Sequence, residues 1–379
     1  MTDPTPAQVV VLGGGYAGVM AANRLRRDAD LDITLVNPRP QFVERIRLHQ
    51  QVAGTGEAAQ PLDDLLGDGI ELVCDAATRI DGPARQVQLA GGRTLDYDYL
   101  IYAIGSRGGA GEIPGAAEFA WRLDELEPAQ QLRARLDELP ATAPVTVVGA
   151  GLTGIEVAAE FAETGRPVTL VGDTLAPSVA EPARRSIART LAALGVTVIT
   201  GTRAAAVRAD HVQLADGREP ASDVTIWTAG FTVPGLADAG GLATDPVGRL
   251  LTDETLTSVT DPRIVAAGDA AAPSGRPLRM SCQSALPLGA QAAATILSRL
   301  AGTEPMAVDQ AFAGQCISVG RRRGVIQLTR RDDTPRRVHL GGRTGALVKE
   351  QICRSTVRFL RWEQRRPGSY HWLRGGRHG

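Results

Sequence analysis

Residues 9–37 combine an apolar run, a glycine-rich turn, a helical pattern and a second apolar run. The first run, Val9–Leu12, has the β-branched composition of a buried strand. Gly13, Gly15 and Gly18 follow it in the G-x-G-x-x-G spacing, and a second strand is expected at Ile33–Val36. These glycines permit a sharp turn, the approach of a pyrophosphate, and close packing of helix on strand. The segment predicts a dinucleotide-binding βαβ unit with phosphates at the helix N-terminus.

The same pattern occurs a second time, 136 residues further along the chain. Gly149, Gly151 and Gly154 follow the apolar run Val145–Val148, and another strand is expected at Val168–Val171. Two such units are stronger evidence than one, because a lone glycine motif also arises in purely structural loops. The sequence therefore predicts two dinucleotide sites in one chain.

Both units depart from the usual pattern at the end of their second strand, where an acidic residue would bind the ribose hydroxyls. The first unit has Asn37, whose amide oxygen still accepts one hydrogen bond. The second has Gly172 followed by Asp173. Dinucleotides with and without a 2′-phosphate both stay open, since Asp173 could replace the acid while Arg184 or Arg185 could pair with a phosphate. We favour the form without the phosphate, because no basic residue immediately follows the strand.

These patterns predict an α/β protein with two Rossmann-like domains and a small C-terminal α+β region. The first dinucleotide domain is expected to be discontinuous, residues 1–115 and 250–304, because the apolar run Ile264–Ala267 leads into a Gly268–Asp269 loop that returns to the first unit. The second domain is expected at 116–249 and the C-terminal region at 305–379.

Charge and cysteine usage limit the classes of partner. The 379 residues carry a net charge of −1, so nucleic acid is not an expected partner. Residues 321–379 nevertheless carry 16 Lys and Arg against 4 Asp and Glu, and such a basic tail suggests a partner surface. The four cysteines show no C-x-x-C or metal-ligand spacing, and no signal region or spanning run is present. We expect a cytoplasmic protein without a metal site.

The arrangement resembles the flavoprotein disulfide-reductase-like superfamily, which has two Rossmann domains. The resemblance rests on both glycine motifs, the AIGS and TAGF loops, and the AAGDAA segment. It implies FAD at the first motif and NADH or NADPH at the second. The cofactor-binding residues that it implies are Gly13, Gly15, Tyr16, Ala17, Gly18, Asn37, Arg45, Ala77, Ala103, Gly105, Gly149, Gly151, Gly154, Gly172, Asp173, Ala229, Gly230, Gly268, Asp269, Gln283 and Ala285.

Within the superfamily, the chain is most similar to type II NADH:quinone oxidoreductases and apoptosis-inducing-factor-like quinone reductases. Its CQSALPLGAQ segment resembles their A-Q-x-A-x-x-x-G helix, with Gln283, Ala285 and Gly289 in register. Pro287 and Leu288 depart from that pattern, because the relatives have a second glutamine just before the glycine. The stretch FVERIRLHQ contains no cysteine where disulfide reductases carry a redox pair. Cys282 is the one remaining candidate for thiol chemistry, and a buried inert thiol is the more common role.

The resemblance therefore implies a flavoenzyme that passes electrons from NAD(P)H to a quinone-like acceptor. The alternatives are a ferredoxin or rubredoxin reductase and a redox-sensing flavoprotein with slow catalytic turnover. Three residues are candidates for catalysis: Glu156 near the nicotinamide, Gln283 beside the flavin, and His49, whose ordinary pKa suits proton transfer. A hydrogen-bonded structural histidine and a helix-capping glutamate are the competing interpretations.

The C-terminal region predicts a helix at Thr344–Arg366 with a basic stripe. The stripe comprises Arg354, Arg358, Arg361 and Arg365, and the residues expected opposite are Ile352, Cys353, Val357, Phe359, Leu360 and Trp362. Packing of this helix on the FAD domain, docking on an anionic membrane surface, and binding of an acidic protein all fit the pattern. Peripheral association with a membrane and a homodimer both stay open.

Overall fold

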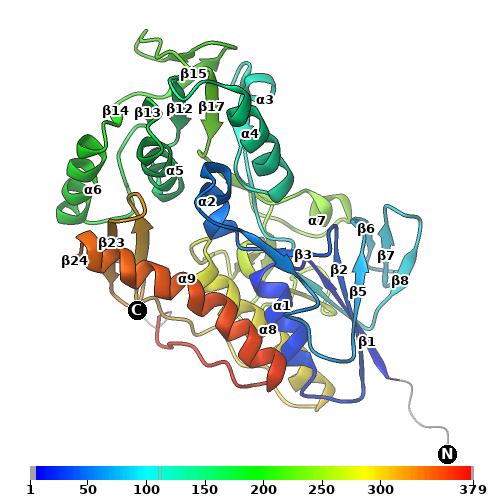
Figure 1. Cartoon of the computed structure of the whole chain (residues 1–379). Coiled ribbons are helices and arrows are strands. Elements are labelled where there is room, and N and C mark those ends of the chain that lie inside the picture. The colour runs from blue at the N-terminus through cyan, green and yellow to red at the C-terminus, as the bar shows by residue number, and fades with distance from the viewer. Residues whose placement is uncertain (1–5, 110, 112, 377–379) are drawn as a thin grey trace, which may run out of the picture.

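The computed structural model describes residues 6–109, 111 and 113–376 (Figure 1). Its first sheet is parallel, with strand order β20-β9-β1-β2-β5. The order places a strand from late in the chain at the edge of the first βαβ unit. The strands are β1 (Ala7–Leu12), β2 (Leu31–Asn37), β5 (Ile70–Cys74), β9 (Tyr99–Tyr102) and β20 (Ile264–Ala266).

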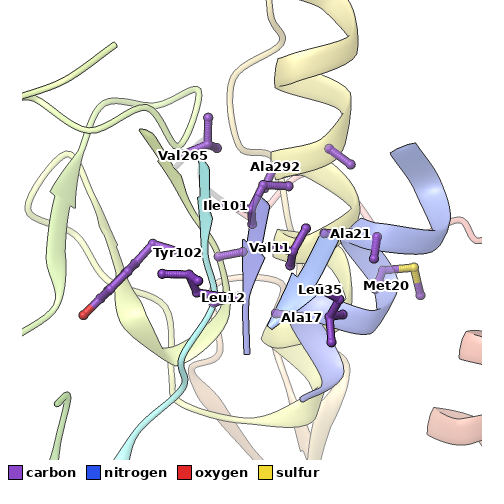
Figure 2. Packing of buried hydrophobic residues seen from close by; sticks show 14 of the residues in the cluster. Val11, Leu12, Ala17, Met20, Ala21, Leu35, Ile101, Tyr102, Val265 and Ala292 are labelled. Carbon is purple, nitrogen blue, oxygen red and sulfur yellow. The ribbon is translucent and has the colours of Figure 1, made fainter. Parts of the chain in front are cut away.

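Two helices cover this sheet and meet each other closely. They are α1 (Tyr16–Leu25), which follows the first glycine loop, and α8 (Cys282–Leu300). A Cβ atom on Gly289 of α8 would lie 2.2 Å from the carbonyl oxygen of Ala17, so the two backbones touch. Figure 2 shows the core between them, where Val11, Ile101 and Val265 of the strands meet Met20 of α1 and Ala292 of α8.

Short elements connect the strands of the first sheet. Between β2 and β5, the strands β3 (Gln41–Val43) and β4 (Ala59–Pro61) pair with each other, and the segment between them contains η1 (Arg45–Arg47) and α2 (Leu48–Ala53). A three-stranded antiparallel sheet connects β5 to β9. Its strands are β6 (Ala77–Asp81), β7 (Gln86–Leu89) and β8 (Thr94–Asp96). These three strands form a meander inserted between two strands of the parallel sheet.

The second sheet is also parallel, with order β11-β17-β12-β13-β14. Its helices are α4 (Leu126–Glu138), α5 (Leu152–Glu163) and α6 (Glu181–Ala193). Its strands are β11 (Ala120–Arg122), β12 (Val145–Val148), β13 (Val168–Val171), β14 (Thr197–Ile199) and β17 (Val224–Trp227), and the hairpin β15 (Ala204–Val207) and β16 (Val212–Leu214) precedes β17. The expected strands β12 and β13 have the predicted bounds.

Small elements link the two sheets. β10 (Arg107–Gly108) pairs with β18 (Phe231–Thr232), and β19 (Leu250–Thr252) pairs with β21 (Ala271–Pro273). The remaining ones are α3 (Ala116–Phe119), α7 (Leu236–Ala239) and η2 (Gly268–Ala270). The segments Arg107–Gly108 and Ala120–Arg122 thus contribute a strand to two different sheets.

The C-terminal region is an antiparallel sheet followed by one long helix. Its strands are β22 (Gly314–Ser318), β23 (Gly324–Thr329) and β24 (Pro335–Leu340), and the helix is α9 (Gly342–Arg365). Figure 1 shows α9 running from this sheet toward α1 and α8. In the described part of the chain, no helix combines the length and apolar composition that crossing a membrane requires.

The inner face of α9 packs on the first domain, which is one of the three expected arrangements. Cys353, Val357 and Leu360 are buried there. Glu363 is fully buried and accepts hydrogen bonds from Arg24 of α1 at 2.7 and 3.1 Å. The predictions for Ile352 and Trp362 are wrong, because both side chains are exposed, and the Trp362 ring lies against the Arg358 guanidinium on the outer face.

Candidate active site

Two adjoining cavities follow the carboxyl ends of the first sheet. We call them the adenosine-side cavity, lined by Asn37 and Ala77 among others, and the central cavity, lined by His49 and Glu156 among others. Both are lined by Gly15, Val43, Arg45, Ala103, Gly105, Ser106 and Asp124, so together they form one elongated space. Crevices at this edge of a parallel sheet are where dinucleotides bind.

The first glycine loop has the geometry that a pyrophosphate requires. Gly13 has φ +104°, and a Cβ on Gly18 would lie 1.8 Å from the Gly13 carbonyl oxygen, so both positions need glycine. A Cβ on Gly15, in contrast, would meet no protein atom within 4 Å and would project into the shared space. The loop therefore leaves room for phosphates at the N-terminus of α1.

Asn37 ends β2 inside the adenosine-side cavity, as expected for a ribose-binding position. Its Oδ1 accepts a hydrogen bond from the Gly14 amide at 2.9 Å, and its Nδ2 donates to the Arg39 carbonyl at 2.6 Å. An amide can form four hydrogen bonds, so one acceptor and one donor position stay available for a ribose.

The Gly268–Asp269 loop reaches the central cavity, as the resemblance implies. Asp269 Oδ2 accepts a hydrogen bond from Ser106 Oγ at 2.7 Å, and Arg45 Nη1 donates to the same hydroxyl at 3.5 Å. These three side chains belong to segments far apart in the sequence. Tyr16, Ala17, Ala103, Gly105, Gly230, Gly268 and Ala285, all expected to bind a cofactor, also line this cavity.

The second glycine loop repeats the geometry of the first. Gly149 has φ +117°, a Cβ on Gly154 would lie 1.8 Å from the Gly149 carbonyl oxygen, and a Cβ on Gly151 would meet nothing within 4 Å. Gly172 also needs glycine, because a Cβ there would lie 2.8 Å from the Ala150 amide nitrogen. Packing thus excludes an acidic side chain at this strand end.

Of the residues expected at the nicotinamide dinucleotide, Glu156 and Gly230 line the central cavity. The others line neither cavity: Gly149, Gly151, Gly154, Gly172, Asp173 and Ala229. Asp173 lies at the surface, where Arg203 Nη2 approaches its Oδ2 to 3.4 Å. The Ala229 carbonyl accepts a hydrogen bond from Trp227 Nε1 at 2.8 Å.

Glu156 and His49 meet at the wall of the central cavity, together with two residues that the sequence analysis did not single out. Glu156 Oε1 lies 2.9 Å from Lys349 Nζ of α9 and accepts a hydrogen bond from the Ser318 amide at 2.9 Å. The Ser318 hydroxyl lies 3.5 Å from His49 Nε2. All four residues are buried.

Their burial sets the protonation states. Burial, reinforced by the Lys349 ammonium and two arginines, lowers the pKa of His49 to about 4 against the pull of Glu156. Burial alone would raise the pKa of Glu156, but the Lys349 ammonium, together with His49 and the hydrogen bond from the Ser318 amide, outweighs burial and holds that pKa below its usual range. Glu156 and Lys349 therefore form an ion pair beside a neutral imidazole. The expectation that His49 has a pKa suited to proton donation is wrong for this buried position.

Residue spacing does not identify Lys349 as a site residue, but the amino-acid composition singles it out. It is the one lysine among 41 Lys and Arg residues. An ammonium is a compact point charge, whereas a guanidinium is a planar fork. All the other basic residues of the chain are arginines, so this single lysine stands out in the sequence.

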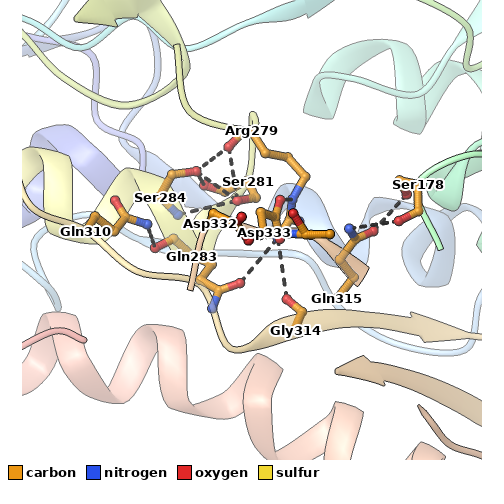
Figure 3. A network of polar contacts seen from close by, with 11 residues as sticks. Ser178, Arg279, Ser281, Gln283, Ser284, Gln310, Gly314, Gln315, Asp332 and Asp333 are labelled. Carbon is orange, nitrogen blue, oxygen red and sulfur yellow. Dashed lines mark hydrogen bonds and ion pairs between the residues drawn. The ribbon is translucent and has the colours of Figure 1, made fainter. Parts of the chain in front are cut away.

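Gln283 does not line the central cavity, in contrast to its expected role beside the flavin. Its amide faces the start of β22, where its nitrogen donates to the Gly314 carbonyl at 2.9 Å and its oxygen accepts from the Ala313 amide at 3.1 Å. Figure 3 shows the polar network that holds it, in which Arg279 also pairs with Asp333. Gln283 thus connects α8 to the C-terminal sheet, and the same helix departs from the family motif at Pro287 and Leu288.

Cys282 lines the central cavity, the one cysteine to do so among the described residues. Burial, with Cys316 nearby, raises its pKa to about 12. Since the thiolate is the reactive form, this thiol is not poised for redox chemistry.

Comparison with known proteins assigns this arrangement to a family. The family model described as pyridine nucleotide-disulphide oxidoreductase matches residues 7–294. The chain belongs to this family. FAD and NADH or NADPH are its cofactors, and it is an oxidoreductase. The two glycine loops supply the room that these two dinucleotides need.

Individual relatives cover most of the chain. An NADH dehydrogenase-like protein of Mycobacterium tuberculosis is 33% identical over 324 residues, 77% of this chain and 80% of the relative. A type II NADH:quinone oxidoreductase of Staphylococcus haemolyticus is 26% identical over 91% of this chain and 94% of its own length. The solved structure of NDH2 from Plasmodium falciparum in complex with NADH has a TM-score of 0.80 at 16% identity, covering 96% of this chain and 99% of that one, and so shares its fold.

Proposed function

We propose that the protein oxidises NADH or NADPH through FAD and delivers the electrons to a quinone. The observation that carries this proposal is the central cavity, in which Cys282 is the one cysteine among the described lining residues and its thiol is protonated. Electrons then leave without a protein disulfide. The whole-length relative named as an NADH:quinone oxidoreductase supports a quinone as acceptor.

FAD, when bound, accepts a hydride from the nicotinamide and passes electrons to the acceptor. The protein residues bind and orient it. The amides at the start of α1 would hold the pyrophosphate, and Asp269, oriented by the hydrogen bond from Ser106, would contact the ribitol or the pyrophosphate. Glu156, kept ionised by Lys349, presents a fixed negative charge to the cavity, where a nicotinamide gains positive charge on oxidation.

The decisive experiment is anaerobic reduction of the FAD-loaded protein by NADH or NADPH, followed by a soluble quinone such as menadione. We expect one nucleotide to bleach the flavin rapidly and the quinone to restore its absorbance at once. Fast bleaching with slow reoxidation by menadione would contradict the proposal, and fast reoxidation by a ferredoxin would favour the alternative acceptor.

We also propose that NADH is the preferred donor. Asp173 is the acid nearest the end of β13, and its carboxylate would repel the 2′-phosphate of NADPH. Equal kcat/KM values for the two nucleotides would contradict this preference.

We propose, as a further part of the function, that the outer face of α9 contacts an anionic membrane surface. Arg354, Arg358, Arg361 and Arg365 are exposed along it, with Trp362 among them. Such a face is typical of helices that lie at a lipid interface. Sedimentation with phosphatidylglycerol vesicles tests this, and a variant with Arg358 and Arg361 replaced by Gln should remain in the supernatant.

A further inference from the structure

A third cavity lies between α2, the β22–β23 turn and the first turns of α9. Its volume is about 430 Å³, within the range of small-molecule sites. Ser318 and Lys349 line it, while their contact partners His49 and Glu156 line the central cavity. We call this space the arginine cavity, because Arg321, Arg322 and Arg343 line it.

The arginine cavity carries an excess of positive charge. Its one acidic lining residue, Glu350, is already neutralised by Arg47 at 3.1 Å and Arg354 at 2.8 Å. Arg321 points toward Glu160 of α5, with Nε 3.7 Å from the carboxylate. The two remaining side chains, Arg322 and Arg343, have no ion pair or hydrogen bond to any described residue.

Two glycines hold the elements that carry these free guanidinium groups. A Cβ on Gly345 would lie 2.3 Å from the Gly324 carbonyl oxygen, and a Cβ on Gly324 would lie 2.9 Å from the Ala346 amide nitrogen. The β22–β23 hairpin and α9 therefore touch backbone to backbone. Because Arg322 and Arg343 each precede one of these glycines by two residues, the contact fixes their Cα positions relative to each other.

We propose that the arginine cavity binds a small polyanion, a metabolite bearing phosphate or carboxylate groups, between Arg322 and Arg343. Guanidinium groups form paired, directional hydrogen bonds with such oxygens. Three like charges in the tight turn Arg321–Arg323 repel one another, and a bound anion offsets that repulsion. A recessed ligand is favoured over a flat lipid surface because Lys349, on the cavity wall, is only 7% exposed.

An anion in this cavity would share the Lys349 ammonium with Glu156. Its binding therefore couples to the charge at the wall of the central cavity, although the site itself does not depend on the identity of the electron acceptor. Binding also adds negative charge near His49 and so should raise the pKa of that imidazole.

The single lysine makes a direct test available. Protein grown with ¹³C-labelled lysine has one lysine signal, from Lys349, and inorganic pyrophosphate is titrated into the FAD-loaded protein at constant ionic strength. We expect a saturable shift of that signal. In the variant R322Q/R343Q we expect at least tenfold weaker binding, whereas R323Q should bind as the native protein does, because exposed Arg323 belongs to the same turn but does not line the cavity.

Three results would overturn the proposal. The first is the absence of any shift with pyrophosphate. The second is equal weakening of binding in R323Q and R322Q/R343Q, which would indicate non-specific charge attraction. The third is a shift with phosphatidylglycerol vesicles but not with pyrophosphate, which would indicate a lipid contact. None of these results depends on quinone reduction, so failure of the proposed function is detected separately by the anaerobic assay.

Discussion

Replacing Glu363 by Gln should loosen the end of α9 from α1. The Glu363 side chain has no exposure, and Arg24 is 6% exposed. Besides Arg24, the Gly368 amide donates to Glu363 at 2.6 Å and the Tyr370 amide at 2.8 Å. A neutral amide in this position leaves the Arg24 guanidinium buried without its counter-ion.

Removing one partner of a buried ion pair costs about 3–5 kcal/mol, a large fraction of the roughly 5–15 kcal/mol by which folded proteins are stable. We therefore expect E363Q to unfold at a lower urea concentration and to lose hydrogen-exchange protection in the last turns of α9. The double variant R24M/E363Q should recover about 0.5–3 kcal/mol relative to E363Q, because it buries no unpaired charge.

Glu71 provides the matched control. It pairs with Arg93 at 2.9 Å, but both side chains are about half exposed, so E71Q should cost less than about 1 kcal/mol. The reasoning is refuted if E363Q is as stable as E71Q, or if the double variant shows no recovery.

Three further predictions concern the cofactor sites. His49 binds fewer protons in the folded protein than in the unfolded chain between about pH 4 and pH 6.5, so the free energy of unfolding should fall as the pH is lowered through that range. Between pH 6.5 and 5, H49Q should lose roughly 1.5 kcal/mol less of this free energy than the native protein in urea unfolding, and parallel curves would contradict the burial argument. G289A should be destabilised by about 1–3 kcal/mol and retain less FAD, measured as flavin absorbance per protein, since its Cβ collides with Ala17. D173A should raise kcat/KM for NADPH relative to NADH several-fold in steady-state assays, and an unchanged ratio would remove Asp173 from coenzyme choice.

The two βαβ units could be predicted from the sequence because their signals are local. Strand composition, glycine spacing and helical periodicity all lie within about 30 residues, and the strands Val145–Val148 and Val168–Val171 have the predicted bounds. The same locality explains why Gly15 and Asp269 line the crevice in which the sequence places them: each lies in a loop that directly follows a predicted strand.

The partners of these residues could not be predicted in the same way. Glu156 meets Lys349 and Ser318, and Arg24 meets Glu363, across more than 150 residues of chain. Helical periodicity gives the faces of α9 but not which face the first domain covers at each turn, and so Trp362 was placed wrongly. The likeness of residues 282–289 to a family motif also does not reveal that Gln283 turns to Gly314.

The position of α1 between α8 and α9 has a consequence for how the chain is made. α1 leaves the ribosome well before the helices that cover it and the strand β20 that completes its sheet, which are all synthesised after residue 263. The second sheet, by contrast, is built from residues 120–227 and is finished while the first is still open. Until α8 and α9 emerge, the nascent chain exposes the apolar surface of α1, and during this period it depends most on chaperones.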